Sequence, residues 1–189
     1  MNIRRNLKSI GIIGVLSLCI IGFGVHYFAN RSERELEKQI LAMDGMSVNL
    51  AFDKAEAFYG GFDSVYSSCL VKKLVLFVDS TSCSGCFLSH LVSYYEINDS
   101  LAAHNGELLV VLHPRKDRLD EIDRRLGLER FPFWCIVDRE GEFVRHNPNI
   151  PDNHILHTFA LDETDKVILV GDPTRNSRIK ELFYEEVLK

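Results

Sequence analysis

An apolar run near the N-terminus limits what this chain can fold into more than any other feature of its sequence. Residues 9–29, SIGIIGVLSLCIIGFGVHYFA, contain no Asp, Glu, Lys or Arg. As an α-helix the run is about 30 Å long, enough to cross the hydrocarbon core of a bilayer. A buried core helix is not normally apolar on every side and preceded by a basic leader. We expect residues 9–29 to be a transmembrane helix that anchors the chain.

Charges on either side of the run predict its orientation. Arg4, Arg5 and Lys8 precede it, whereas RSERELEK after it has as many acids as bases. The positive-inside bias keeps residues 1–8 in the cytoplasm as a basic leader. The chain is then a single-pass protein of the inner (cytoplasmic) membrane whose C-terminal domain is periplasmic or otherwise extracytoplasmic. A cleaved signal peptide is the alternative, although VHYFAN is a poor cleavage site.

The external part of the chain is acidic. With the three early bases set aside, about 19 Lys and Arg remain against 27 Asp and Glu, a net charge of about −8. We therefore expect no nucleic-acid partner. Four of the five cysteines lie outside the apolar run, in a compartment where thiols can form disulfides.

Buried strands alternate with helices from Val71 onward. KLVLFVD at 73–79 and ELLVVLHP at 107–114 are apolar runs typical of strands in a parallel sheet. Helical patterns follow each of them, and FPFWCIVD is a third strand. HTFALD and KVILVG form an antiparallel hairpin, and a helix closes the chain. This order predicts an α/β domain at 71–189, a mainly parallel sheet with helices on both faces and a hairpin at one edge. Residues 30–70 are expected to be a helical stem and lead-in.

Two cysteines separated by two small residues follow the first strand, in STSCSGCFLSH. Cys83 comes at the start of the predicted helix, where unpaired N–H groups stabilise a thiolate. Cys86 lies one turn further on, near enough to attack a mixed disulfide formed at Cys83. This spacing favours a redox couple. Two inert thiols remain an alternative, as does a zinc site, although no second close pair of ligands is present.

Cys135 lies inside the apolar strand FPFWCIVD. A cysteine in such a strand commonly packs as a small hydrophobic side chain. A disulfide between Cys69 and Cys135 is the alternative interpretation, because sequence does not show the distance between them.

The chain resembles the thioredoxin superfamily, and more closely its membrane-anchored TlpA-like and peroxiredoxin-related envelope proteins. The residues that carry the resemblance are KLVLFVD, CSGC opening a helix, FPFWCIVDREGEF and HTFALDETDKVILVGDP, within residues 71–189. The resemblance implies a thioredoxin-like fold with a central mixed sheet flanked by helices. It implies a thiol-disulfide oxidoreductase with Cys83 as attacking and Cys86 as resolving cysteine. Its partners are then envelope proteins with disulfides or thiols and an unidentified electron donor, with no dissociable cofactor and no metal.

Several positions depart from the family pattern. Ser82 replaces the usual tryptophan before the first cysteine, and Phe77 stands where many members bury an acid. His157 occupies the position of the cis-proline, unless a second register makes Pro132 that residue. His157 and Asp79 are possible auxiliary groups, with His157 as a proton carrier near the couple or both as structural residues. These departures leave a binding or redox-sensing module as the alternative function, and a peroxidase as a weaker one.

Overall fold

The computed structural model describes residues 31–52, 55–66, 71–82 and 84–189. The expected leader, the expected anchor at 9–29, Cys69 and Cys83 lie outside the described residues. Within the described ranges, no helix has both the length and the apolar character needed to cross a membrane. The chain divides into two compact units, residues 1–41 and 42–189. Residues 31–43 are helical, as the spacing of apolar residues in the stem predicts.

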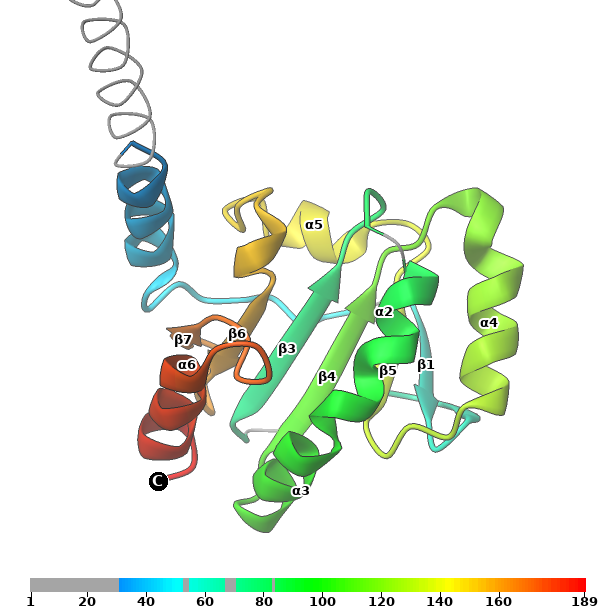
Figure 1. Ribbon diagram of the computed structural model, residues 1–189. Helices are drawn as coiled ribbons and strands as arrows, with labels where there is room; N and C mark the ends of the chain where they lie inside the picture. Colours follow the sequence, from blue (N-terminus) through cyan, green and yellow to red (C-terminus); the bar gives the residue numbers. More distant parts are fainter. Residues whose placement is uncertain (1–30, 53–54, 67–70, 83) are drawn as a thin grey trace, which may run out of the picture. The chain divides into compact units, whose positions relative to one another are not determined.

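Seven strands in the described part of the second unit form one mixed sheet in the order β2-β1-β5-β4-β3-β6-β7 (Figure 1). The strands are β1 (Glu56–Tyr59), β2 (Phe62–Ser64), β3 (Lys73–Val78), β4 (Glu107–Leu112), β5 (Trp134–Val137), β6 (Thr158–Leu161) and β7 (Val167–Val170). Strands β3, β4 and β5 are parallel, and β6 and β7 form an antiparallel hairpin beside β3. The predicted parallel centre and antiparallel hairpin edge are confirmed.

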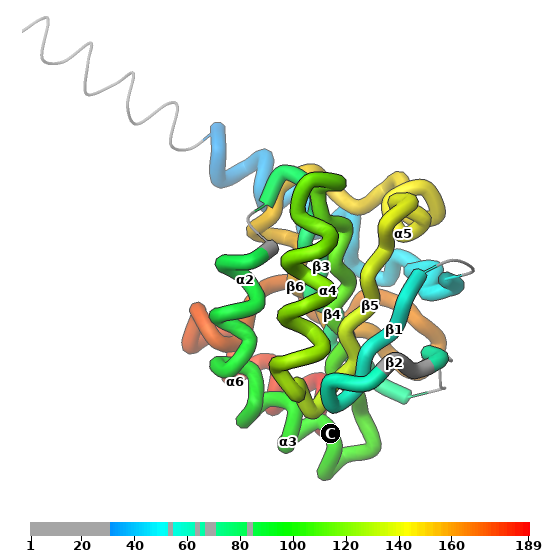
Figure 2. Tube along the Cα trace, turned by 90° about the vertical axis from the view of Figure 1, so that its right-hand side faces the viewer, coloured from blue at the N-terminus to red at the C-terminus, as the bar shows by residue number. Residues whose placement is uncertain are grey.

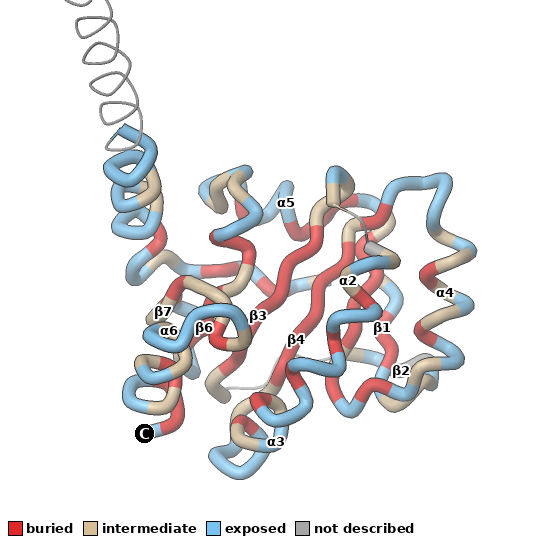
Figure 3. The backbone as a smooth tube through the Cα atoms, viewed as in Figure 1, coloured by how far each residue is buried: buried red, intermediate tan, exposed pale blue. Residues whose placement is uncertain are grey.

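Helices cover both faces of this sheet, which explains why β3 and β4 are apolar beyond their first residues, Lys73 and Glu107. The helical segments are α2 (Ser84–His90), η1 (Leu91–Tyr94), α3 (Tyr95–Ala103), η2 (Lys116–Arg118), α4 (Leu119–Leu128), α5 (Glu142–His146), η3 (His154–Leu156), α6 (Ser177–Leu182) and η4 (Phe183–Val187). Leu74, Leu76 and Val78 of β3 belong to the main core with residues of α2, α3, α4 and η4. Phe77, on the opposite face of β3, packs against Phe143 of α5. Strands β3 and β4 are accordingly buried along their length (Figure 3).

The sheet extends further toward the N-terminus than the expected domain boundary at residue 71. Strand β1 pairs antiparallel with β5, and β2 pairs with β1 (Figure 2). Gly60 and Gly61 join them, with φ of 62° and 84° that suit glycine. Residues 56–64 are therefore part of the sheet and not a lead-in, which corrects the predicted boundary. The sequence of residues 56–64 gives only a weak strand pattern, because β1 is four residues long and both its ends are exposed.

The position of His157 distinguishes the two alignments considered for the family's cis-proline, one at His157 and the other at Pro132. His157 directly precedes β6, and its carbonyl accepts a hydrogen bond of 2.8 Å from the N–H of Phe77. None of the peptide bonds in the described ranges is cis, including the bond before Pro132. The second register, with Pro132 as the cis-proline, is therefore wrong, and His157 holds the position next to β3.

Cys135 is a buried free thiol in β5, with 1% of its surface exposed. Burial raises the pKa of this thiol, because a thiolate is disfavoured away from water. The alternative disulfide with Cys69 is thus wrong, and the interpretation of Cys135 as a small hydrophobic side chain is confirmed.

Candidate redox site

Asp79 shapes the turn that connects β3 to α2. Its Oδ1 atom accepts hydrogen bonds from the backbone N–H groups of Thr81 and Ser82, both at 3.0 Å. The hydroxyls of the same two residues donate to it at 2.8 and 2.9 Å. An aspartate commonly forms such a turn by bonding the backbone two residues ahead. Asp79 therefore fixes the backbone immediately before the Cys83-Ser84-Gly85-Cys86 sequence.

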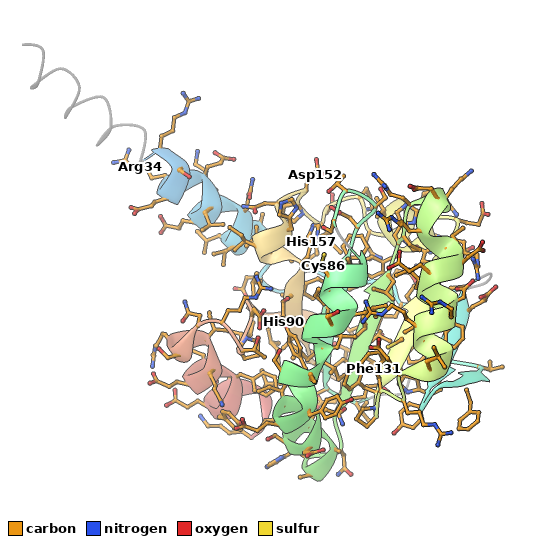
Figure 4. All side chains as sticks on the ribbon, turned by 45° about the vertical axis from the view of Figure 1, so that its right-hand side comes forward. Arg34, Cys86, His90, Phe131, Asp152 and His157 are labelled. Carbon is orange, nitrogen blue, oxygen red and sulfur yellow. The ribbon has the colours of Figure 1, made fainter. Side chains whose placement is uncertain are left out.

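Cys86 lies in the first turn of α2 (Figure 4). It is exposed, in contrast to Cys135. Cys86 is disulfide-bonded, whereas Cys135 is a free thiol. The two cysteines in the described ranges therefore differ in both access and oxidation state, and the difference favours chemistry at Cys86.

An open groove of about 480 Å³ runs past Cys86. One wall consists of the turn and α2, and the other carries charged side chains from η2, α4 and the residue before them. The groove is lined by Thr81, Ser82, Gly85, Cys86, Ser89, Arg115, Arg118 and Glu121. Cys86 is therefore open to solvent along a mostly polar surface.

Arg125 connects α4 to α2. Its guanidinium donates to the carbonyl of Gly85, between the two cysteines, and to the hydroxyl of Ser89 at 3.1 Å. A third hydrogen bond, of 2.8 Å, joins it to Glu129 on its own helix. Sequence reasoning missed this residue, because Arg125 looks like any other charged residue on the solvent face of an amphipathic helix.

The other side of the turn contains a buried histidine. His157 is 4% exposed, and its Nε2 atom donates to the carbonyl of Pro151 at 2.8 Å. Its Nδ1 atom is buried without a hydrogen-bond partner among the described residues, 4.0 Å from Oδ2 of Asp79. The ring of Phe77 lies 4.9 Å away between centroids. The two predicted auxiliary residues are thus neighbours.

Burial and hydrogen bonding set the charges of this pair. Burial lowers the pKa of His157 below its usual value, although the hydrogen bond to Pro151 and the charge of Asp79 act in the opposite direction. Burial acts to raise the pKa of Asp79, but hydrogen bonds from Thr81 and Ser82 outweigh it and hold the pKa below its usual value. At neutral pH a neutral imidazole therefore faces an ionised carboxylate.

A cavity of about 380 Å³ adjoins this histidine. Aromatic and aliphatic side chains supply much of its wall, with Phe77, Phe143, Ile150 and Pro151 among them. Phe77 occupies the position expected for a buried acid and places an aromatic ring there, while the carboxylates of Asp79, Glu140 and Asp152 also line the cavity. Across the described ranges, no group of three His, Cys, Asp or Glu side chains is placed to bind a metal ion.

Several solved structures are similar to this chain at low sequence identity. No family model and no curated protein matches the chain. A thioredoxin-like protein of Porphyromonas gingivalis is 15% identical, over 75% of this chain and 96% of its own, with a TM-score of 0.46. The exposed lipoprotein thioredoxin of Streptococcus pneumoniae is 18% identical, over 69% and 97%, with a TM-score of 0.49.

A third similar structure is the bacterioferritin comigratory protein of Xanthomonas campestris, described for its alkyl peroxide reduction. It is 14% identical, over 74% of this chain and 94% of its own, with a TM-score of 0.47. The parallel strands β3 to β5 with the antiparallel β6–β7 hairpin beside β3 are a thioredoxin-like fold.

Proposed function

We propose that this chain is a membrane-anchored thiol-disulfide oxidoreductase that exchanges disulfides with envelope proteins through Cys83 and Cys86. The observation that carries the proposal is a disulfide-bonded, exposed Cys86 in the first helical turn after a central buried strand. Reactive groups of α/β proteins typically lie at this end of the strands. We propose Cys83 as the partner of Cys86 in the disulfide.

The reaction consists of two thiol-disulfide exchanges. The Cys83 thiolate attacks a substrate disulfide, which forms a mixed disulfide and releases one substrate thiolate. The Cys86 thiolate then attacks the sulfur of Cys83, releases the second substrate thiolate and closes the Cys83–Cys86 disulfide. Two electrons pass to the substrate, and a donor dithiol must return them. His157 is proposed as the base that accepts a proton through Nδ1, with Asp79 stabilising the resulting charge.

An insulin-reduction assay of the full-length chain in detergent micelles, with dithiothreitol as electron source, tests the activity. The wild type is expected to accelerate insulin reduction, and Cys83→Ser and Cys86→Ser are expected to lose the acceleration. Cys135→Ala is the matched control, because it removes a cysteine that is buried and unpaired. Equal rates for the wild type and the Cys83→Ser variant contradict the proposal.

Trapping of mixed disulfides tests whether envelope proteins are the substrates. A Cys86→Ala variant cannot resolve mixed disulfides, so they should accumulate on Cys83 in isolated membranes. The same chain with Cys83 also replaced by alanine should trap none. If the first variant traps no protein, the envelope-substrate part of the proposal is wrong.

The alternative is a thioredoxin-fold binding or redox-sensing module without efficient turnover. Phe77 and His157 favour it, because they replace the acid and the proline that family members place around the couple. A module of this kind would keep the Cys83–Cys86 disulfide and yet show neither insulin reduction nor trapped partners.

The proposed location follows from the sequence. Residues 9–29 are proposed to span the inner membrane, with residues 1–8 in the cytoplasm and the thioredoxin-like unit outside. Mass analysis of the mature protein from membranes should find Met1 retained in the N-terminal peptide. A new N-terminus near Asn30 would show a cleaved signal peptide instead.

A further inference from the structure

The second cysteine of the couple is accessible from the side of α4. Cys86 is exposed and lines the groove that Arg115, Arg118 and Glu121 border on the opposite wall. Ser82, Gly85 and Ser89, which flank Cys86 in this groove, all have small side chains. A thiol-bearing molecule in the groove can therefore reach the sulfur of Cys86 without displacing an element of the fold.

We propose that the electron donor reduces the couple by attacking Cys86 from this groove, whereas substrates react at Cys83. The inference rests on the proposed function and names the part of the surface that its donor uses. A donor thiolate attacks Sγ of Cys86, the Cys83–Cys86 bond breaks, and Cys83 leaves as a thiolate. A second donor thiolate then attacks the donor sulfur bound to Cys86 and releases Cys86 as a thiolate. The donor is oxidised to a disulfide, and the couple gains two electrons.

The chemistry of exchange agrees with attack at this sulfur. Which sulfur of a disulfide is attacked depends on access and on the pKa of the thiol that leaves. Cys83 is the proposed attacking thiolate of the substrate reaction, and a thiol that serves as a good thiolate nucleophile at neutral pH is also a good leaving group. Attack on Cys86 therefore returns Cys83 directly in the ionised form that the substrate reaction needs.

The charges around the groove indicate the kind of donor. Two guanidinium groups, of Arg115 and Arg118, line it against the single carboxylate of Glu121. Both side chains are more than half exposed, at 57% and 58%. Among the residues that line the groove, the charges of the two arginines and Glu121 leave an excess of one positive charge. Glu121 pairs with Arg118, and Asp117, which lies outside the lining, pairs with Arg115. The donor expected here presents a thiol beside acidic groups.

Three small thiols with the same two-carbon skeleton test both parts of the inference. Oxidised full-length chain in neutral detergent micelles is mixed with 2-mercaptoethanesulfonate, 2-mercaptoethanol or cysteamine, compared at equal thiolate concentration. N-ethylmaleimide quenches early time points, and peptide mass spectrometry locates the adduct. We expect the adduct on Cys86 and the maleimide on Cys83. We also expect the anionic thiol to react several-fold faster than the cationic one. Adducts mainly on Cys83, or equal rates for all three thiols, overturn the inference.

A pair of variants assigns the charge preference to the groove. Arg118→Gln should reduce the preference for the anionic thiol by about half, while Arg130→Gln, an exposed arginine over the ring of Phe62, should leave it unchanged. Equal effects of the two variants contradict a groove-specific charge. The outcome is separable from the proposed function: adducts on Cys83 with intact insulin reduction reject only the donor site. Adducts on Cys86 without insulin reduction reject only the proposed function.

Discussion

The turn between β3 and α2 has one side formed by buried side chains and another formed by exposed ones. On one side, Phe77, Phe143 and His157 form a buried wall beside Asp79. On the other side, Cys86 faces a groove lined with exposed arginines. Thr81 borders both cavities. Thr81 thus lies between a buried aromatic wall and a groove lined by exposed arginines.

This difference predicts which substitutions change the free energy of unfolding and which change reaction rates. Changes on the buried side should cost free energy of unfolding, because they remove packing and hydrogen bonds that water cannot replace. Changes on the open side should alter reaction rates and leave stability nearly unchanged, because exposed ion pairs contribute little.

Phe77→Ala should lower the free energy of unfolding by about 3 to 4 kcal/mol, because it leaves a cavity between Phe143 and His157. Urea unfolding of the full-length chain, followed by circular dichroism, measures the change. Phe62→Ala is the matched control, because Phe62 is 65% exposed and should cost less than about 1 kcal/mol. Equal losses in the two variants would remove the evidence for a packed wall at Phe77.

Asp79→Ala should cost about 1 to 2 kcal/mol, because it deprives two backbone N–H groups and two hydroxyls of their acceptor. The same unfolding experiment measures it. Asp117→Ala removes an exposed aspartate that pairs with the exposed Arg115 and should cost less than about 0.5 kcal/mol. A loss below that level for Asp79→Ala contradicts its role in holding the turn.

His157 should make the free energy of unfolding fall as the pH decreases below 6.5, the ordinary pKa of histidine. Burial lowers its pKa in the folded chain, so the unfolded chain binds a proton first. The contribution is fully present above this pH and is lost at no more than about 1.4 kcal/mol per pH unit below it. Unfolding free energies at about pH 7.5 and pH 5.5 should differ less in His157→Gln than in the wild type. His104→Gln, at an exposed histidine, should behave as the wild type, and an unchanged slope in His157→Gln disproves the assignment.

Arg118→Gln should have the smallest effect on stability, within about 0.5 kcal/mol, because its ion pair with Glu121 is exposed. Urea unfolding again measures it. A loss above about 1 kcal/mol would mean that the open side also holds the fold together.

Much of the fold could be predicted because fully buried strands appear in sequence as continuous apolar runs, as β3 and β4 do. The pairing of β1 with β5 could not, because a four-residue strand with exposed ends resembles a loop and its partner lies far along the chain. The turn before α2 could be placed because the cysteine pair directly follows an apolar strand pattern in the sequence. The contact of Arg125 with Gly85 could not, because it joins residues 40 positions apart and depends on how α4 packs against α2.

Both the proposed activity and the proposed donor site depend on a Cys83–Cys86 disulfide, which a redox titration can detect. Full-length chain is equilibrated with mixtures of reduced and oxidised glutathione, alkylated and mapped by peptide mass spectrometry. The account predicts that Cys83 and Cys86 become reduced together in one two-electron transition, while Cys135 stays a thiol throughout. Reduction of Cys86 together with Cys69, with Cys83 a thiol at every potential, would contradict it.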